Sequence, residues 1–302
     1  MENPLVRTGY ILSAIWLPLS FYFLAASLFV VIVKFIFHNS IPFLPHITFS
    51  MVFLFIFYGL INSRKIRIRE IKVHLPNLPE FWKGKIAVLA SDFHFGHVLR
   101  KPSAKKLVKI INSLNPDIVF IPGDFFDGAK SDFRGVASIF TKIVSPLGTY
   151  FVSGNHEVIA GLEICKEAIA EAGIQLLENK KAEIQGLQIL GTSYQNKETA
   201  ESLTKVLADL NIDKNKPSIL LKHVPDHLEA VGNTNISLTL CGHTHLGQIW
   251  PFNIITKKMF TGFDYGLNKL GRNLVYTSSG VGTWGPPVRI FTHAEIVKIT
   301  FE

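Results

Sequence analysis

The sequence predicts an α/β chain in which two β-sheets pack face to face between helices, with one or two transmembrane helices ahead of them. Two observations support this fold class. The first 63 residues contain two long runs without a charged side chain. From residue 65 onward, short apolar strand patterns alternate with helical patterns and give way to a strand-rich second half. Such alternation is typical of a layered domain, in which every sheet and helix buries its apolar side against a neighbour.

The first uncharged run, residues 10–33, predicts a transmembrane helix. Its 24 residues would extend for about 36 Å at a rise of roughly 1.5 Å per residue, which is enough to cross a hydrocarbon core about 30 Å thick. A signal peptide is the competing interpretation. It fits less well, because only Arg7 precedes the run as a basic residue and no small-x-small cleavage site occurs before His38.

The second uncharged run, residues 41–61, is interrupted near its start by Pro42, Pro45 and His46. Its clean part, residues 47–61, is only 15 residues long, which is too short to span a bilayer, whereas the whole run is just long enough. We favour two spans, with a re-entrant or interfacial second segment as the alternative.

Cations after the second run set the expected orientation. By the positive-inside rule, everything after residue 63 faces the cytoplasm from the inner membrane. The N-terminus lies inside if two helices span and outside if only one does. We expect residues 1–63 to form a membrane anchor and residues 64–302 a cytoplasmic domain, whose first residues also attract anionic headgroups. The cations are Arg64, Lys65, Arg67, Arg69 and Lys72.

Composition leaves several partners open. The net charge of +8 suits nucleic acid, anionic lipid or a phosphorylated substrate, and equally an ordinary basic surface. Cys165 and Cys241 lack the spacing of a metal site and are too few for a secreted disulfide framework. Nothing in the sequence indicates the oligomeric state.

The pattern after residue 65 is regular enough to assign approximate elements. Lys65–Arg69 alternates like an exposed edge strand, and a helix after Pro102 places Ala104, Leu107, Val108 and Ile111 on one face. Further strands are expected at residues 85–91, 117–122, 149–153, 187–191, 218–221, 237–240, 274–278 and 289–301, and further helices near residues 136–144, 162–172 and 199–210. Residues 249–270 show no clean period.

Polar clusters stand at the ends of several of these strands. Asp124 follows the buried strand that ends at Pro122, and an open α/β sheet carries its chemistry at the carboxyl ends of its strands. One Gly-Asp pair after a strand is more often a simple turn, but four further clusters accompany this one. Together they offer oxygen and imidazole ligands that suit a pair of divalent transition metals. The four are Asp92 with His94, Asn155 with His156 and Glu157, His223, and His243 with His245.

Taken in order, the five clusters resemble the signatures of the calcineurin-like metallophosphoesterase superfamily, from about residue 85 to the C-terminus. The resemblance implies a four-layer α-β-β-α sandwich that binds two divalent metal ions, of Mn, Fe or Zn. His156 would stabilise the transition state or protonate the leaving oxygen, and Asp127 and Glu157 would orient ligands. The first ion would be held by Asp92, His94, Asp124 and His245, and the second by Asp124, Asn155, His223 and His243.

The implied chemistry explains why these residue types are needed. Hydrolysis of a phosphoester requires a hydroxide at neutral pH and neutralisation of the charge that builds on the phosphoryl oxygens, and two ions roughly 3.5–4 Å apart provide both. A bridging carboxylate fixes that separation, and Asp124 is the candidate. His97 and Trp284 match no ligand position. As a hypothesis both touch substrate, although an ordinary surface-loop histidine is the favoured interpretation of His97.

A narrower resemblance is to the YaeI/YkuE-type bacterial phosphoesterases, a group that includes a membrane-associated UDP-2,3-diacylglucosamine pyrophosphatase of lipid A synthesis. It rests on the N-terminal hydrophobic anchor and on residues 92–97, 242–248 and 280–289. Phe93 and Phe95 replace the commoner Leu, and residues 292–295 replace the usual Arg-Pro-Glu ending. These departures touch no predicted metal ligand.

We therefore predict a membrane-anchored, binuclear metal-dependent phosphoesterase that hydrolyses a phosphodiester or pyrophosphate bond. Its expected partners are the bilayer and a lipid-linked nucleotide such as UDP-2,3-diacylglucosamine. A nucleotide or nucleic-acid phosphodiesterase is less favoured, because the basic residues cluster by the membrane segments. A protein phosphatase and a non-catalytic metal-binding scaffold are further rival functions. The aromatic and basic residues 249–270 would either line a lipid-phosphate site or form an ordinary packed insertion.

Overall fold

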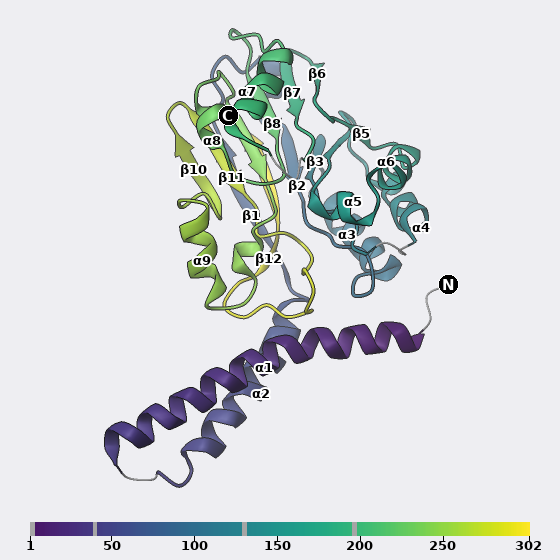
Figure 1. Ribbon diagram of the computed structural model, residues 1–302. Coiled ribbons are helices and arrows are strands. Elements are labelled where there is room, and N and C mark those ends of the chain that lie inside the picture. Colours follow the sequence, from purple (N-terminus) through teal and green to yellow (C-terminus); the bar gives the residue numbers. More distant parts are fainter. Residues whose placement is uncertain (1–3, 39–40, 129–131, 195–197) are drawn as a thin grey trace.

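The computed structural model describes residues 4–38, 41–128, 132–194 and 198–302. Two N-terminal helices form a hairpin, and the rest of the chain folds into two six-stranded sheets with helices on their outer faces (Figure 1). The predicted four-layer α-β-β-α sandwich is therefore confirmed.

The first sheet contains the strands that follow the hairpin, together with the last strand of the chain. Its central strands β2, β3 and β4 are parallel, and helices α3 (Lys101–Ser113), α4 (Phe133–Ala137), α5 (Asn155–Ala160) and α6 (Leu162–Glu171) pack on its outer face. In spatial order the strands are β1 (Ile66–Val73), β12 (Ala294–Phe301), β2 (Ile86–Leu89), β3 (Ile118–Pro122), β4 (Thr149–Val152) and β5 (Gln175–Leu176).

The second sheet is built from the later part of the chain. Strands β7, β8, β9 and β11 are parallel to one another, and helices α7 (Ala200–Asp209) and α8 (Leu228–Gly232) cover its outer face. In spatial order the strands are β10 (Gly266–Leu270), β11 (Asn273–Thr277), β9 (Leu238–Cys241), β8 (Ser218–Leu221), β7 (Leu187–Gly191) and β6 (Lys180–Ile184).

Alternation of side chains divides the core into layers. On β2, Ala87 and Leu89 face the second sheet, while Val88 faces the helices of the first. Both faces of the central strands are buried, so they appear in the sequence as continuous apolar runs. Because parallel strands end at the same edge of each sheet, the loops after them gather at one end of the sandwich.

Several predicted elements are confirmed, and others differ. Strand β1 lies at the edge of its sheet and is mostly exposed, and α3 buries the predicted face. The helix expected at residues 136–144 is instead α4 followed by a 3-10 turn, Ser138–Lys142. The strand expected from Arg289 begins only at Ala294, because Arg289 lies buried in the preceding loop. Two more 3-10 turns occupy Glu80–Trp82 and His245–Gly247.

Both uncharged runs are helices, and each is long and apolar enough to cross a membrane. Helix α1 (Pro4–Phe37) extends beyond the predicted residues 10–33 at both ends, because a helix can include flanking cations whose long side chains reach water. Helix α2 (Leu44–Asn62) begins after Pro42 and keeps Pro45 in its first turn, where a proline costs no backbone hydrogen bond.

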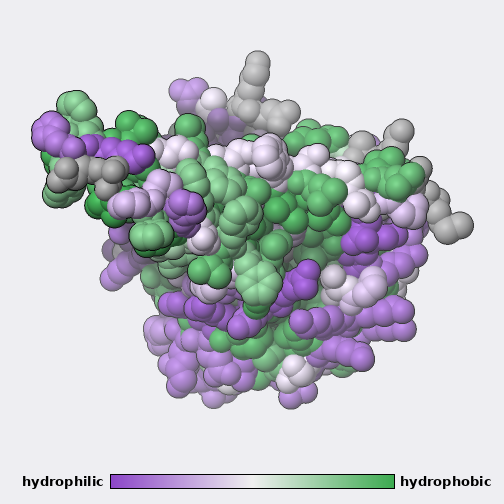
Figure 2. All heavy atoms as spheres, turned by 90° about the horizontal axis from the view of Figure 1, so that it is seen from below, coloured by the Kyte–Doolittle hydropathy of each residue, from purple (hydrophilic) through white to green (hydrophobic). Residues whose placement is uncertain are grey.

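The hairpin carries a large apolar surface. Its helices pack together through Tyr22, Ala26, Val52 and Ile56, whereas side chains such as Leu24, with 72% of its area exposed, point outward. Seen from below, hydrophobic residues gather along the helices and on the adjoining side of the sandwich (Figure 2). A surface of this extent is unfavourable in water and is typical of a segment that contacts a membrane.

Candidate metal centre

The predicted ligands come from loops at the carboxyl ends of parallel strands. Asp92 and His94 follow β2, Asp124 follows β3, and Asn155 begins the short helix α5 after β4. The second sheet contributes its ligands in the same way: His223 follows β8, and His243 and His245 follow β9. The structure thus brings together all seven predicted ligands, which are separated by up to 153 positions in the chain.

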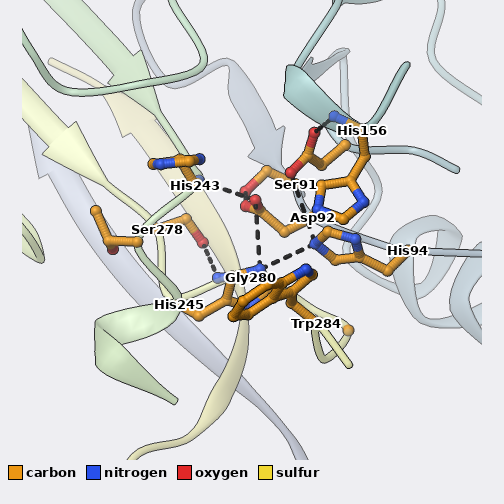
Figure 3. Close-up of polar contacts among 12 residues, drawn as sticks. Ser91, Asp92, His94, His156, His243, His245, Ser278, Gly280 and Trp284 are labelled. Atoms are coloured by element: carbon orange, nitrogen blue, oxygen red, sulfur yellow. Dashed lines mark hydrogen bonds and ion pairs between the residues drawn. The ribbon is translucent and has the colours of Figure 1, made fainter. Parts of the chain in front are cut away.

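The first group of donor atoms is centred on His94 and His245 (Figure 3). Their Nε2 atoms are 2.9 Å apart. His94 Nε2 lies 3.7 Å from Asp124 Oδ2, and His245 Nε2 lies 3.8 Å from Asp92 Oδ1. These four side chains are buried.

The second group is centred on Asn155. Its Oδ1 atom lies 3.0 Å from His223 Nε2 and 3.0 Å from His243 Nδ1. His223 Nε2 is also 3.2 Å from Asp124 Oδ2. Asp124 therefore belongs to both groups, which share a single carboxylate.

These separations test whether the donors fit a metal ion. Two ligands that each lie about 2.1 Å from one ion are roughly 3–3.5 Å apart, and the measured separations run from 2.9 to 3.8 Å. Imidazole, carboxylate and amide oxygen are a donor mixture that suits divalent transition metals. The residues thus fit the predicted kind of cofactor.

Burial and neighbouring charges favour the metal-binding protonation states. Burial lowers the pKa of His94 and of His243 to about 4, and it also lowers the pKa of His245. These imidazoles are neutral at pH 7, the form that binds metals. Burial alone would lower the pKa of His223, but the Asp124 carboxylate raises it to about 9. Metal binding at His223 would therefore release a proton.

The backbone of the ligand loops is strained. Five predicted ligands have a left-handed conformation with φ between 49° and 72°. For a residue with a Cβ atom such a conformation costs about 1–2 kcal/mol, and clusters of these residues are found where a site must be held in one geometry. The five are Asp92, His94, Asp124, His243 and His245.

Comparison with known proteins agrees with this geometry. The model of the calcineurin-like phosphoesterase family matches residues 86–247, which is more than half of the chain. The chain belongs to the calcineurin-like phosphoesterase family. The predicted family is confirmed, and membership supports a phosphoester hydrolase that uses divalent metal ions.

Relatives of this phosphoesterase include proteins named for a membrane segment. An uncharacterised metallophosphoesterase of Campylobacter jejuni is 32% identical and aligns with 82% of this chain and 67% of its own length. A transmembrane protein with a metallophosphoesterase domain from Danio rerio is 31% identical over 81% of this chain and 60% of that protein. Metallophosphoesterase YkuE of Bacillus subtilis is 26% identical over 74% of this chain and 82% of YkuE, which confirms the predicted likeness to YkuE. This chain thus spans only about two thirds of the length of the Campylobacter jejuni protein and of the Danio rerio protein.

Two motif glycines allow the loops of the phosphoesterase to approach one another. A Cβ atom on Gly154 would overlap the Asp124 carboxylate, and one on Gly242 would overlap the carboxylate of Asp92. Larger residues at these positions would push a predicted ligand away from its group, so the glycines are needed for close packing around the donors.

Glu157 and Asp127 lie behind the donors. The fully buried Glu157 carboxylate accepts hydrogen bonds from the backbone N–H groups of Asp124 (2.9 Å), Phe126 (3.0 Å) and Gly154 (2.8 Å). It thereby ties the loop after β3 to the loop after β4. The Asp127 carboxylate lies 3.0 Å from Nδ1 of His156 and so fixes the orientation of that ring.

Ser91 and Arg289 also support the site, although sequence reasoning missed them. The Ser91 hydroxyl donates to Asp92 Oδ2. Arg289 is fully buried and donates to the carbonyl oxygens of His245 (3.2 Å), Ser279 (2.7 Å) and Gly282 (2.7 Å). Arg289 ends the stretch 280–289 that carries the narrower resemblance, but nothing in the sequence marked it as buried, because an arginine is ordinarily exposed.

The two predicted substrate contacts lie outside the donor groups. The ring of His97 packs against Tyr10 of α1, with 4.6 Å between ring centroids. Trp284 is 59% exposed, and its backbone is held by both ends of the Gln248 amide at 2.9 Å. In the view of Figure 3 the indole lies on the side of the site that His94 and His245 occupy. Contact of either residue with substrate stays a prediction.

Proposed function

We propose that this protein is a membrane-anchored, binuclear phosphoesterase that hydrolyses a phosphodiester or pyrophosphate bond of a lipid-linked nucleotide. UDP-2,3-diacylglucosamine is the first substrate to test. The observation that carries the proposal is the position of Asp124 between two donor groups, one containing His94 and the other His223. A shared carboxylate of this kind is what a two-metal hydrolase needs.

Two ions of Mn, Fe or Zn, when bound, would supply a hydroxide at neutral pH and neutralise charge on the phosphoryl group. The first group, Asp92, His94, Asp124 and His245, would hold one ion. The second group, Asp124, Asn155, His223 and His243, would hold the other.

His156 is suited to carry the proton for the leaving oxygen. Burial alone would lower its pKa, but the hydrogen bond to Asp127 and the charges of Asp124 and Asp127 raise the pKa above the usual value. Because Nδ1 is engaged by Asp127, Nε2 is the nitrogen left to donate to substrate. A protonated imidazole in this position can give its proton to the departing oxygen.

The anchor supports a substrate at the membrane surface. Arg7 Nε near the start of α1 donates to the carbonyl oxygen of His97 at 2.9 Å, and Asn62 Nδ2 at the end of α2 donates to that of Thr292 at 2.7 Å. Both ends of the hairpin therefore contact the phosphoesterase domain, which favours two spans over one. The exposed cations from Arg64 to Lys72 favour the cytoplasmic side of the inner membrane for that domain.

The decisive measurement is release of nucleoside monophosphate from UDP-2,3-diacylglucosamine by the full-length protein with Mn²⁺, with EDTA, and in the variant Asp124→Asn. We expect turnover that requires both the metal and Asp124. His156→Gln is the variant matched to Asp124→Asn. It removes the proposed proton donor and leaves all seven predicted ligands in place.

Two different outcomes would redirect the assignment. Cleavage of bis-p-nitrophenyl phosphate without cleavage of the lipid would retain a metal-dependent phosphodiesterase and reject the lipid-linked substrate. Metal binding without turnover of either compound would reject the enzyme and favour a scaffold.

A further inference from the structure

A cavity of about 400 Å³ lies between the membrane hairpin and the phosphoesterase domain. Helix α1 contributes Ile11 and Ile15 to its wall, and α2 contributes Leu60. The domain closes the other side with Phe95 from the loop after β2 and Leu107 from α3. The cavity is thus bounded by the two helices that would enter the bilayer and by the loop that bears two predicted ligands.

The size and walls of this cavity suit a hydrocarbon chain. Most of its lining side chains are aliphatic or aromatic. An apolar cavity of roughly 150 Å³ holds one benzene ring, so on that scale a cavity of about 400 Å³ has room for a chain of roughly 15 carbon atoms. On the α1 side, Ile11 and Ile15 present apolar side chains to the cavity, and Arg7 lines it nearer the start of the helix.

Charge at the rim selects an anionic molecule. Arg7, Arg64 and Lys106 line the cavity, and no Asp or Glu is among its described lining residues. Within the part of the chain that the structure describes, none of the three cations forms an ion pair with a carboxylate. Cations beside an apolar cavity are the pattern that binds a phosphate attached to a hydrocarbon chain.

The cavity and the metal centre share two loops. Phe93 and Phe95 line the cavity and alternate with Asp92 and His94, which belong to the first donor group. Gly282 also lines the cavity, and its N–H donates to the carbonyl oxygen of Asp92 at 2.8 Å. The cavity therefore borders the loops that hold Asp92 and His94 of the first donor group.

We propose that this cavity is the acyl-chain subsite of the phosphoesterase: one acyl chain of the substrate lies between α1, α2 and α3, and Arg7, Arg64 and Lys106 attract the phosphates next to it. The proposal rests on the function proposed above and deepens it, since it assigns the part of the molecule that selects a lipid.

The test compares two inhibitors of bis-p-nitrophenyl phosphate hydrolysis by the full-length protein in nanodiscs. Dodecyl phosphate carries a chain, whereas methyl phosphate carries none. We expect dodecyl phosphate to inhibit at least tenfold more strongly in the wild type. Ile11→Trp fills the cavity and should reduce this preference to within about twofold, with inhibition by methyl phosphate unchanged. Leu12→Trp is the matched control, because Leu12 is 63% exposed and does not line the cavity.

A second pair of variants tests the charges on α3 without altering the apolar wall. Lys106→Glu should weaken inhibition by dodecyl phosphate several-fold, whereas Lys105→Glu, the neighbouring exposed residue that does not line the cavity, should leave it unchanged. An equal chain-length preference in wild type and Ile11→Trp, with the variant folded, would overturn the proposal. So would non-competitive inhibition, because it would place the chain in a site unrelated to the substrate.

Labelling separates this proposal from the proposed function. A photoreactive dodecyl phosphate should attach to residues of the cavity wall even in a protein that hydrolyses neither lipid nor diester. Labelling confined to other surfaces would overturn the acyl-chain subsite, whatever the enzyme assays show. Labelling of the wall together with an inert UDP-2,3-diacylglucosamine would retain the subsite and reject only that lipid.

Discussion

At the scale of single residues, the pair of His156 and Asp127 governs the proton in the proposed reaction. The carboxylate lies 3.0 Å from the ring Nδ1 and, with Asp124, raises the pKa of His156 against the effect of burial. The protonated ring is therefore retained to higher pH than an ordinary histidine would allow.

Replacement of Asp127 by Asn should change the pH profile of the enzyme. Loss of the negative charge lowers the pKa of His156, so the protonated form disappears at a lower pH. The alkaline limb of kcat/KM should move by about one pH unit toward acid pH, measured with a substrate whose leaving group needs a proton. Bis-p-nitrophenyl phosphate serves as the control, because its leaving group needs little protonation. An unshifted alkaline limb would remove Asp127 from this role.

Arg289 is a second single residue with a large effect, because its side chain donates hydrogen bonds to backbone carbonyl oxygens. Burial lowers the pKa of Arg289 to about 10, so the guanidinium stays charged at neutral pH while it holds carbonyl oxygens of His245 and of the loop containing Ser279 and Gly282. A lysine keeps the charge but lacks the planar fork that reaches several acceptors at once.

Arg289→Lys should therefore destabilise the fold by about 3 kcal/mol, since buried carbonyl groups lose their donor. Thermal unfolding of the metal-free protein measures this loss, and weaker metal binding should accompany it because Arg289 holds the carbonyl group of His245. Arg272→Lys is the matched control, because Arg272 is exposed. Equal melting temperatures for the two variants would contradict the structural role given to Arg289.

At the scale of elements, prediction succeeded where a pattern was long or repeated. The apolar face of α3 recurs over 13 residues, so its period identified both the helix and its buried side. Helix α5 has six residues and β5 has two, which is too short for a period to show, and both were missed. Helix α9 (Phe252–Met259) was also missed, although the exposed Phe252, Ile255 and Met259 share one of its faces, apart from a lysine pair.

Prediction of the site followed the same logic. The predicted ligands could be singled out because five clusters occur in a fixed order at strand ends, and their division into two groups came from the family resemblance. Arg289 escaped because its role depends on His245, a residue distant in sequence that only the folded chain brings near. Ser91 is the immediate neighbour of Asp92 and was overlooked beside it. The left-handed backbone of the ligand loops is likewise a consequence of tertiary packing rather than of local preference.

At the scale of the whole molecule, α9 lies beside the helical hairpin. Its apolar residues are exposed, and Phe252 contacts Phe21 of α1 with ring centroids 5.3 Å apart. The sequence left residues 249–270 as either a lipid-phosphate site or an ordinary packed insertion. An amphipathic helix beside α1 favours contact with a bilayer.

Met259→Glu should lower turnover of a lipid substrate in vesicles several-fold, because Met259 is 68% exposed and a carboxylate there would be repelled by anionic headgroups. Hydrolysis of soluble bis-p-nitrophenyl phosphate should stay unchanged, since Met259 lies outside both donor groups. Met259→Leu is the matched control, because it keeps an apolar side chain at the same place. Equal turnover of the lipid by the two variants would argue that α9 does not contact the membrane.

The hairpin also bears on which side of the membrane the chain begins. Arg7 and Asn62 both contact the phosphoesterase domain, and α1 and α2 pack along each other between these contacts. A chain that crossed only once would have to separate Arg7 from the carbonyl oxygen of His97, and it would expose Tyr22 and Ala26 without their partners on α2. The contacts therefore favour two crossings, with the N-terminus and the domain on one side.

Cysteine labelling of intact spheroplasts can test this topology. After replacement of Cys165 and Cys241 by Ser, single cysteines are placed at Thr8, near the start of α1, and at Lys105 on the domain. Both should resist a membrane-impermeant maleimide until the membrane is permeabilised, because the five cations after α2 favour retention of the domain in the cytoplasm. A cysteine at His38, in the turn between the helices, should react in intact cells. Reaction at residue 8 but not at residue 105 would show a single span, and it would mean that the packing of α1 beneath the domain does not form in the membrane.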